Sequence, residues 1–537
     1  MAQIIQVCKY LIFILLLFQF KLSGTTDLRT NNIGSFLSWN YAKQSSDLVN
    51  QKFFFPKVDL EKIDNKYLEE LLIDSIIFND WNKSNLISKI ILERDKTNIL
   101  ANFFQVVENF ITNKPIDKYL KGIDPKYFDS NFVRAINIWS DFDKKSSLSV
   151  EEDCVPIICL HAALFYKKKN NKKKEEFFFQ KIINKDFVSL RLKEILLLNS
   201  LETKNEISAL KINKELQKSN VNFQKYNEIF LTNNKQLLNP INNAKDGLAE
   251  VFYNISSWYF SNDLYKYSIF FGKLSMRLRQ NFNSMKILLA GSLSQMNLEQ
   301  LGLQELDKLN NQNIYYLKML KMRLVFLEKL GKTDLFIDEI VSFTSRFPNE
   351  IEMKVLLADK YRQTKKYEEA IKIYTQVIDH KSLLNKSNIL YSRGISYERI
   401  NRWNSAEKDF KTSLNLNPED PYVMNYLAYS WLDREINIPK ALKLLIRAVE
   451  IEPTDAYIRD SLGWAYYLAK NFEESITHLE KAVVMLPDDA TLNDHLGDAY
   501  WMSDRKSEAK SQWKKVLNLD PDYKEKENIK KKISRGL

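Results

Sequence analysis

Two short stretches contain residue types that suit phosphate or zinc chemistry, but each lacks part of the required pattern. Gly331 to Thr333 matches the end of a phosphate-binding loop, whose amides and lysine hold phosphate groups. The first glycine of such a loop would fall where Phe326 stands, so we interpret Gly331 as the end of a helix. His478 to Glu480 matches the start of a deaminase zinc motif, yet no pair of cysteines follows it. Neither stretch predicts a catalytic site.

The chain has 3 cysteines and 4 histidines, which leaves little material for a metal centre. Cys154, Cys159 and His161 lie close enough in sequence to offer three ligands of the kind that zinc takes. We interpret them instead as small buried residues at the start of a helix. A disulfide would need Pro156 to interrupt that helix, because residues five apart on a continuous helix point in different directions. We therefore expect two free thiols, no metal and no cofactor.

The chain is basic, with 79 Lys and Arg against 68 Asp and Glu and a formal net charge of +11. The densest cluster runs from Lys167 to Lys174, where lysines flank Asn170 and Asn171. Such a cluster can bind nucleic acid or anionic lipid. No aromatic residue that could stack on a base interrupts these lysines, so we interpret the cluster as a solvated turn between two helices. We expect no nucleic-acid partner.

A pattern that occurs twice near the C-terminus organises the elements of the chain. Leu462-Gly463-x-x-Tyr466 recurs as Leu496-Gly497-x-x-Tyr500, and Pro487 recurs as Pro521 at the same distance. The distance is about 34 residues, a period that is typical of arrays of paired helices. Such units stack on one another, because a single unit cannot bury its own apolar face.

Each position of this pattern has a physical role in pairing two helices. The Leu and the Tyr are four residues apart and therefore lie on one face of the first helix. Gly463 has no side chain, which lets the second helix approach closely, and Ser475 and Ala509 are small for the same reason. Leu479 and Trp513 are large enough to fill the space between the helices. The proline ends the second helix.

These units resemble the tetratricopeptide repeat (TPR) family. The resemblance implies an all-α fold, an α-solenoid (superhelix) of stacked antiparallel helix pairs. Three further units contain the motifs Leu357-Ala358-x-x-Tyr361, Arg393-Gly394-x-x-Tyr397 and Leu427-Ala428-x-x-Trp431. We expect degenerate repeats over residues 31–243, divergent repeats over 244–350, well-formed repeats over 351–521, and a capping helix with a basic tail over 522–537. Pro125 and Pro156 are expected to begin helices.

The segment of residues 1–24 is expected to direct export. Lys9 precedes an apolar run from Tyr10 to Phe20, which is shorter than the roughly 20 residues that span a bilayer but suits a secretory signal. Cleavage after Gly24 would place Leu22 where a small residue is preferred, so an uncleaved membrane anchor is the alternative. Cys8 lies before the apolar run, which argues against a lipidated cysteine.

In the TPR family the second, fifth, ninth and twelfth positions of each unit line a concave groove. On this sequence they give a candidate protein-binding groove of Tyr422, Asn425, Tyr429 and Leu432, then Tyr457, Asp460, Trp464 and Tyr467, then Thr491, Asp494, Asp498 and Trp501. Large aromatic side chains on such a face favour a protein or peptide partner. Trp464 and Tyr429 are our candidate anchors, whereas Tyr467 and Trp501 fit equally well as packing between units. The aspartates favour a partner that carries Lys or Arg.

The resemblance extends to a group of proteobacterial envelope TPR proteins, some of which are adaptors of carboxyl-terminal processing proteases. It is carried by the runs from Asp460 to Tyr466 and from Asp494 to Trp501, and by Gly247 to Glu250. It implies a non-enzymatic scaffold in the periplasm or cell envelope of a Gram-negative bacterium, with a periplasmic protease and its substrates as partners. Contact with a membrane would come only from an uncleaved signal segment.

The alternative is an enzyme, or an enzyme subunit, with its site in the degenerate helical region of residues 31–243. A buried and convergent set of acid, base or nucleophile groups in that region would favour it.

Overall fold

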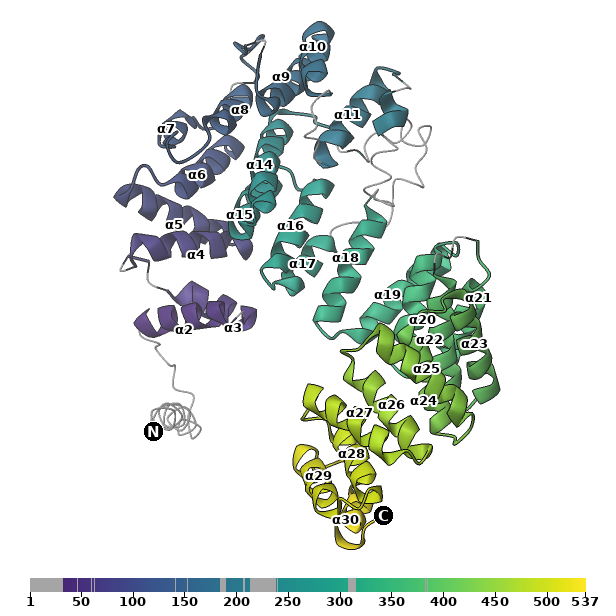
Figure 1. Ribbon diagram of the computed structural model, residues 1–537. Coiled ribbons are helices and arrows are strands. Elements are labelled where there is room, and N and C mark those ends of the chain that lie inside the picture. The colour runs from purple at the N-terminus through teal and green to yellow at the C-terminus, as the bar shows by residue number, and fades with distance from the viewer. Residues whose placement is uncertain are drawn as a thin grey trace. The chain divides into compact units, whose positions relative to one another are not determined.

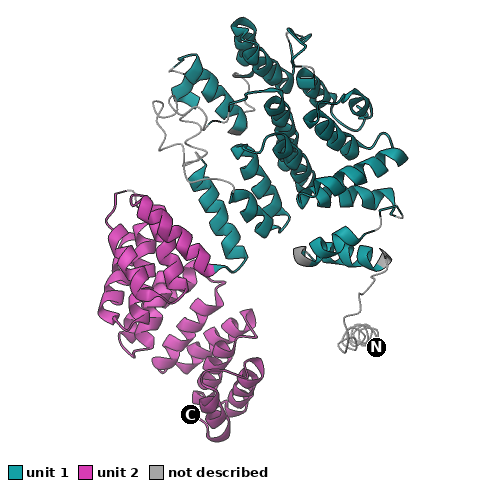
Figure 2. Ribbon diagram, turned by 180° about the vertical axis from the view of Figure 1, so that it is seen from behind, with its two compact units in different colours: residues 1–332 teal, residues 333–537 magenta. Residues whose placement is uncertain are grey.

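The computed structural model describes residues 32–537 except 46, 59, 62, 141, 152, 184–189, 206–207, 213–237, 239, 308–314, 382 and 384. Every regular element in this described part is a helix, which confirms the predicted all-α solenoid (Figure 1). The chain divides into two compact units, unit 1 over residues 1–332 and unit 2 over residues 333–537 (Figure 2). The expected signal segment, residues 1–24, lies outside the described residues.

Unit 1 consists of helix pairs of uneven length. Its described helices are α2 (Asn32–Gln44), α3 (Leu48–Phe54), η1 (Phe55–Lys57), α4 (Asn65–Ile77), α5 (Trp81–Arg94), α6 (Ile99–Ile111), α7 (Asp117–Lys121), α8 (Ser130–Ser140), α9 (Pro156–Lys168), α10 (Lys172–Ile183), α11 (Leu190–Glu202), α14 (Ala244–Ser261), α15 (Tyr265–Leu278), α16 (Asn283–Gln295), α17 (Glu299–Leu306) and α18 (Tyr316–Lys329). Gly331 follows α18 with φ +66°, as expected for a residue that ends a helix.

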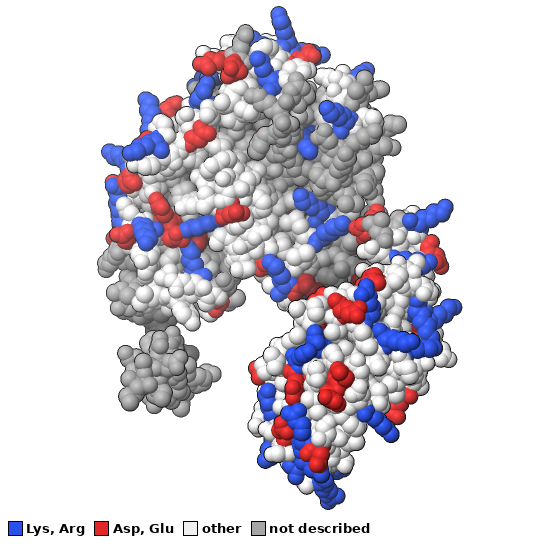
Figure 3. All heavy atoms as spheres, viewed as in Figure 1, with Lys and Arg blue, Asp and Glu red and all other residues white. Residues whose placement is uncertain are grey.

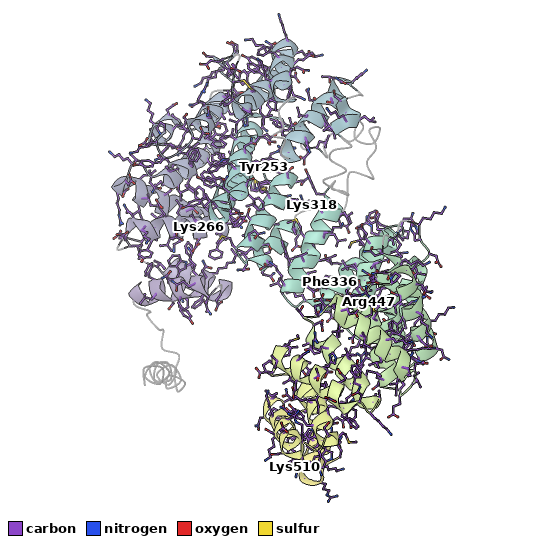
Figure 4. The ribbon with its side chains drawn as sticks, in the orientation of Figure 1. Tyr253, Lys266, Lys318, Phe336, Arg447 and Lys510 are labelled. Carbon is purple, nitrogen blue, oxygen red and sulfur yellow. A yellow bond between two sulfur atoms is a disulfide. The ribbon has the colours of Figure 1, made fainter. Side chains whose placement is uncertain are left out.

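Helices α14 and α15 of unit 1 pack against helices far earlier in the chain. Helix α15 contacts α4 and α6, and α14 contacts α8 and α9, so that α4 to α9 lie in an arc beside this pair (Figure 1). Phe103 of α6 meets Phe271 of α15 with ring centroids 5.3 Å apart. At the edge of this interface Lys266, labelled in Figure 4, forms an ion pair with Glu70. The inner side of these early helices is therefore covered by the chain itself.

Unit 2 is a regular stack. Its helices are α19 (Thr333–Arg346), α20 (Ile351–Gln363), α21 (Tyr367–Val377), α22 (Lys386–Arg399), α23 (Trp403–Leu416), α24 (Pro421–Leu432), α25 (Ile438–Ile451), α26 (Ala456–Leu468), α27 (Phe472–Met485), α28 (Ala490–Met502), α29 (Lys506–Leu519) and α30 (Lys526–Arg535). From α20 to α29 consecutive helices form five antiparallel pairs, and each pair contacts the next. The first helices of successive pairs also touch, α24 with α26 and α26 with α28.

The glycine of each pattern lies where the two helices of a pair come closest. A Cβ atom on Gly463 would stand 2.6 Å from Cγ of Leu479, and one on Gly497 would stand 2.5 Å from Nε1 of Trp513. Real Cβ atoms do not approach other heavy atoms so closely. The glycine and the large residue of the second helix therefore fit each other, as the sequence predicts.

An aspartate caps the first helix of three successive pairs, a feature that the sequence reading did not use. Asp420, Asp455 and Asp489 each accept two hydrogen bonds from the first backbone N–H groups of α24, α26 and α28. Each aspartate stands two residues after a proline of the repeat pattern. The proline ends one helix and the aspartate stabilises the start of the next.

The expectation of two free thiols is wrong, because Cys154 and Cys159 form a disulfide with Cα atoms 5.5 Å apart. Helix α9 begins at Pro156, as predicted, so Cys154 lies before the helix and its side chain can turn back towards the first turn. Pro125 does not begin a helix. It lies in a turn, and α8 starts at Ser130.

Candidate functional site

Helices α24, α26 and α28 carry the groove residues predicted from the sequence, and three tyrosines among them are exposed. The exposed fractions are 52% for Tyr422, 39% for Tyr429 and 55% for Tyr457. Tyr422 and Tyr457 occupy the same position in successive repeats, at the start of α24 and α26. Large rings usually lie in a core or an interface, so their exposure in neighbouring repeats marks a surface that can bind a partner.

A cavity of about 350 Å³ opens beside Tyr429. It is lined by Glu398, Arg399, Asn425, Tyr426, Tyr429, Ser430, Asp433 and Arg434. Oδ1 of Asn425 is buried there and accepts no hydrogen bond from the described part of the chain. An unpaired buried acceptor is costly, and a donor supplied by a bound chain would remove that cost. The structure thus brings together Asn425 and Tyr429, two residues of the predicted groove.

Trp464 and Tyr467 are packed into a stack of three rings rather than standing free. The centroid of Trp464 is 4.6 Å from that of Tyr467 and 4.4 Å from that of His495, and all three rings are nearly parallel. Nδ1 of His495 lies 2.9 Å from Oδ1 of Asp460. The stack joins α26 to α28, so Trp464 contributes to the contact between neighbouring repeats.

The carboxylate of Asp460 helps to raise the pKa of two neighbours, His495 and Tyr429. Burial disfavours the charged form of His495, but the attraction of Asp460, with smaller contributions from Asp494 and Asp498, outweighs it and raises the pKa above 6.5. Burial, followed by the negative charge of Asp460, raises the pKa of Tyr429, so this phenol stays protonated and can donate a hydrogen bond.

The other two predicted aspartates bind the C-terminal helix of the chain. Nζ of Lys532, on α30, lies 2.8 Å from Oδ1 of Asp494 and 2.7 Å from Oδ1 of Asp498. Nε1 of Trp513 donates a hydrogen bond of 2.9 Å to Oδ1 of Asp498. Burial and the neighbouring Asp494 raise the pKa of Asp498 to about 6, against the opposite effect of Lys532.

The C-terminal segment also covers the remaining candidates on α28. A Cβ atom on Gly536 would overlap the ring of Trp501, and Thr491 interacts with Tyr523. The predicted groove therefore has two parts. Tyr422, Asn425, Tyr429 and Tyr457 face an open surface, whereas the carboxylates of Asp460, Asp494 and Asp498 are buried and satisfied within the chain.

His495 and Lys532 complete these contacts, and the sequence reading missed both. A signal existed, because each cation follows its carboxylate by one repeat length: His495 is 35 residues after Asp460, and Lys532 is 34 residues after Asp498. A search for opposite charges separated by one repeat length would have found them.

Unit 1 contains a buried ionic cluster with two of its four members, Arg191 and Glu194, in residues 31–243, where the alternative of an enzymatic site was placed. Arg191 and Glu194 of α11 lie with Glu250 of α14 and Arg279, and none of the four side chains is more than 8% exposed. Nη1 of Arg191 lies 2.8 Å from Oε2 of Glu194, and Nη1 of Arg279 lies 3.1 Å from Oε1 of Glu250. Burial raises the pKa of Glu194 to about 6.

This cluster holds helices together. Ser284 of α16 donates a hydrogen bond of 2.8 Å to Glu194, and Tyr253 and Lys318, labelled in Figure 4, lie on α14 and α18. The run Gly247 to Glu250 has two physical roles: a Cβ on Gly247 would overlap the ring of Trp139, and Glu250 pairs with both arginines. The charged groups bind one another, which is the arrangement expected of a structural network.

The described residues contain no group of three or more His, Cys, Asp or Glu side chains that could hold a metal ion. No helix in the described ranges is long and apolar enough to cross a membrane. The lysines from 167 to 174 flank the turn between α9 and α10, where Lys167 pairs with Glu202. On the face of unit 2 seen in Figure 3, acidic and basic side chains are mixed.

Comparisons with known proteins identify the repeat type. Residues 351–379 match the family model described as a tetratricopeptide repeat. A TPR repeat-containing protein of Pseudomonas aeruginosa is 32% identical over 80 residues, which are 15% of this chain. The alignment covers 14% of that curated relative, so the chain matches only a small part of its length.

Two solved structures of MamA are similar over about a third of the chain. MamA from Desulfovibrio magneticus RS-1 has 23% identity and a TM-score of 0.30, and the match covers 33% of this chain and 98% of that one. MamA AMB-1 has 21% identity and a TM-score of 0.28, with 32% of this chain and 92% of that chain covered.

Proposed function

Because the chain is a member of the tetratricopeptide repeat family, we propose that it is a scaffold that binds another protein along the open surface of α24 and α26. This surface, the tyrosine face, consists of Tyr422, Asn425, Tyr429 and Tyr457. The observation that carries the proposal is the exposure of three tyrosines in two successive repeats, next to a cavity with an unpaired acceptor on Asn425. Aromatic rings of this kind supply much of the binding energy at protein interfaces.

The tyrosine face fits a polypeptide in two respects. Its rings offer apolar area, and the phenol of Tyr429, whose pKa is raised by burial and by Asp460, can donate a hydrogen bond. The unpaired oxygen of Asn425 suits a backbone or side-chain N–H of the partner. The carboxylates of Asp460, Asp494 and Asp498 are bound to His495 and Lys532, so the aromatic side chains rather than these charges make the first contact.

The proposed location is the periplasm or cell envelope of a Gram-negative bacterium. The apolar run from Tyr10 to Phe20 supports export. The disulfide between Cys154 and Cys159 supports it independently, because disulfides persist in oxidising compartments and are rare in the cytosol. A role as adaptor between a periplasmic protease and its substrates is the finer form of the proposal, and it rests on the runs from Asp460 to Tyr466 and from Asp494 to Trp501.

The test compares capture of partners by matched variants. The tagged protein is purified from its own cells, and bound proteins are quantified by mass spectrometry. Tyr429→Ala with Tyr457→Ala removes two rings of the tyrosine face. Leu416→Ala with Val484→Ala is the control, because it removes two exposed apolar side chains, 54% and 80% exposed, from the second helices α23 and α27.

Truncation of an aromatic anchor often costs about 2 kcal/mol or more of binding free energy. The tyrosine variant should therefore capture at least tenfold less of each protein that wild type captures. The control variant should retain them. Equal capture by both variants would reject the tyrosine face as the binding surface. If the lost proteins include no protease, the scaffold proposal stands and the adaptor role is rejected.

A further inference from the structure

Helix α30 depends on the last repeat for its position. Five of its ten residues are basic: Lys526, Lys530, Lys531, Lys532 and Arg535. Only Ile529 and Lys532 are buried, and Ile533 packs against the same core partly exposed. A ten-residue helix with so little apolar surface is marginal by itself. Its contacts with α28 and α29 therefore hold it in place.

These contacts define a specific site, the terminal site, formed by Asp494, Asp498 and Trp501 of α28 and Trp513 of α29. Nζ of Lys532 donates hydrogen bonds to Oδ1 of Asp494 and to both carboxylate oxygens of Asp498 over 2.7 to 2.8 Å. Nε1 of Trp513 donates a further hydrogen bond to Oδ1 of Asp498. Two buried carboxylates thus surround one ammonium group. Without a cation between them, both negative charges would be buried and unpaired, which is costly.

The ring of Trp501 in the terminal site leaves room only for a glycine directly after α30. Gly536 has φ +86° and lies against the ring of Trp501, where any Cβ would overlap the ring. Ile529, Lys532 and Gly536 therefore each meet a different feature of the site: the apolar core, the carboxylates and the tryptophan. The site recognises a pattern and not merely positive charge.

The preceding repeat shows why such a site exists at the end of the array. There Asp460, which occupies the position of Asp494, receives its cation from His495 on the first helix of the next repeat. After the pair α28 and α29, α30 stands in the place of the next first helix, and its Lys532 supplies the cation to Asp494. The terminal site is thus the ordinary contact between repeats, presented to a helix that is joined only through the short segment Asp520–Glu525.

We infer that the terminal site is a docking site for a short basic helix, and that α30 is its resident and exchangeable ligand. The occupant is an amphipathic helix with an isoleucine, a lysine three residues later and a glycine four residues after that. A partner protein that carries this pattern binds when α30 leaves. This inference does not depend on the tyrosine face, which lies on α24 and α26.

The probe is a fluorescently labelled peptide of residues 523–537, added to the full-length protein. Wild-type protein should not bind it, because α30 occupies the site. Lys532→Ala removes the resident cation and leaves two buried carboxylates uncompensated, so it should bind the peptide. Lys531→Ala is the matched control, because Lys531 is the exposed neighbour, and it should behave like wild type. A peptide with alanine in place of Lys532 should bind at least tenfold more weakly.

A second variant and a second measurement keep the test decisive. Lys532→Asp expels α30 by repulsion between like charges and should also bind the peptide. In wild-type protein, amide hydrogen exchange should be at least tenfold faster in α30 than in α28, because α30 opens alone. The inference fails if neither variant captures the peptide while its circular dichroism is unchanged. It fails also if both peptides bind equally, or if α30 exchanges no faster than α28.

Discussion

Gly463 shows how the absence of one side chain sets the distance between two helices. Its neighbour Leu479 occupies the volume that a Cβ would need, and the same relation holds for Gly394 with Phe410 and Gly497 with Trp513. The second helix of each of these pairs can therefore approach closely, because the glycine of the first helix has no side chain. Any larger residue at the glycine must move a packed side chain.

Gly463→Ala is expected to destabilise the protein by about 1–3 kcal/mol, the usual cost of overpacking a core. Gly291→Ala is the control, because its Cβ would lie 3.6 Å from the ring of Phe260 in ordinary contact. It should be neutral or slightly stabilising, since alanine favours helices by up to about 1 kcal/mol over glycine. Thermal unfolding followed by circular dichroism measures both. Equal midpoints for the two variants would show that the assigned register is wrong.

His495 gives the contact between α26 and α28 a defined dependence on pH. Its folded pKa is raised above 6.5, so its pairing with Asp460 contributes fully below pH 6.5 and is lost as the pH rises through the folded pKa. His495→Gln keeps a polar side chain without the charge. The difference in unfolding free energy between wild type and this variant should be largest near pH 6, roughly 1.5–3 kcal/mol for a charged hydrogen bond, and should shrink towards pH 9. A difference that is constant over this range would contradict the assignment.

At the scale of elements, a proline and an aspartate with separate roles fix the start of the three repeats that begin with α24, α26 and α28. The proline ends the preceding helix, and the aspartate two residues later accepts hydrogen bonds from the next one. These two roles explain why the helix boundaries of these three repeats recur at a regular spacing along the chain. Unit 1 lacks the periodic Pro-x-Asp pattern, and its helices vary in length.

Asp489→Ala should cost about 1 kcal/mol, because it removes the acceptor of the Thr491 and Leu492 N–H groups at the start of α28. Asp488→Ala is the matched control, because Asp488 is the exposed neighbour and its replacement removes the same charge. Chemical denaturation of both variants under identical conditions provides the measurement. If the two lose equal stability, the effect is one of net charge and not of capping.

At the scale of the whole molecule, both units pair basic groups with acidic ones between helices. In unit 1, Lys266 and Arg277 of α15 pair with Glu70 and Glu108 of earlier helices. In unit 2, Lys532 of α30 pairs with Asp494 and Asp498. Part of the high lysine and arginine content therefore serves internal contacts, which agrees with the mixed charges seen on the surface in Figure 3.

The proposed export predicts the oxidation state of Cys154 and Cys159. We expect the mature chain in the periplasmic fraction, without the signal segment of residues 1–24 and with Cys154 and Cys159 bridged. Thiol alkylation before and after reduction, followed by mass spectrometry of the peptide that contains both, measures the bridge. Expression without the signal segment is the control and should give reduced thiols in the cytosol. Recovery of the full-length chain from the cytosol with free thiols would contradict export.

The sequence by itself determined the local design of unit 2. The spacing of Leu, Gly and Tyr fixes which face of each first helix is buried, because side chains four apart share a helix face. Gly463 and Leu479 could be matched from their positions alone, since both belong to one short hairpin. The aromatic positions Tyr422, Tyr429 and Tyr457 followed from the same count, and all three are exposed.

Only the tertiary structure decided what covers the remaining faces. The partner of Asp498 is Lys532, and the inner side of α4 and α6 is covered by α15, whose Lys266 lies 196 residues after its partner Glu70. The physical reason is that helical periodicity specifies a face but not its neighbour. The neighbour is selected by long-range packing, which local spacing does not encode.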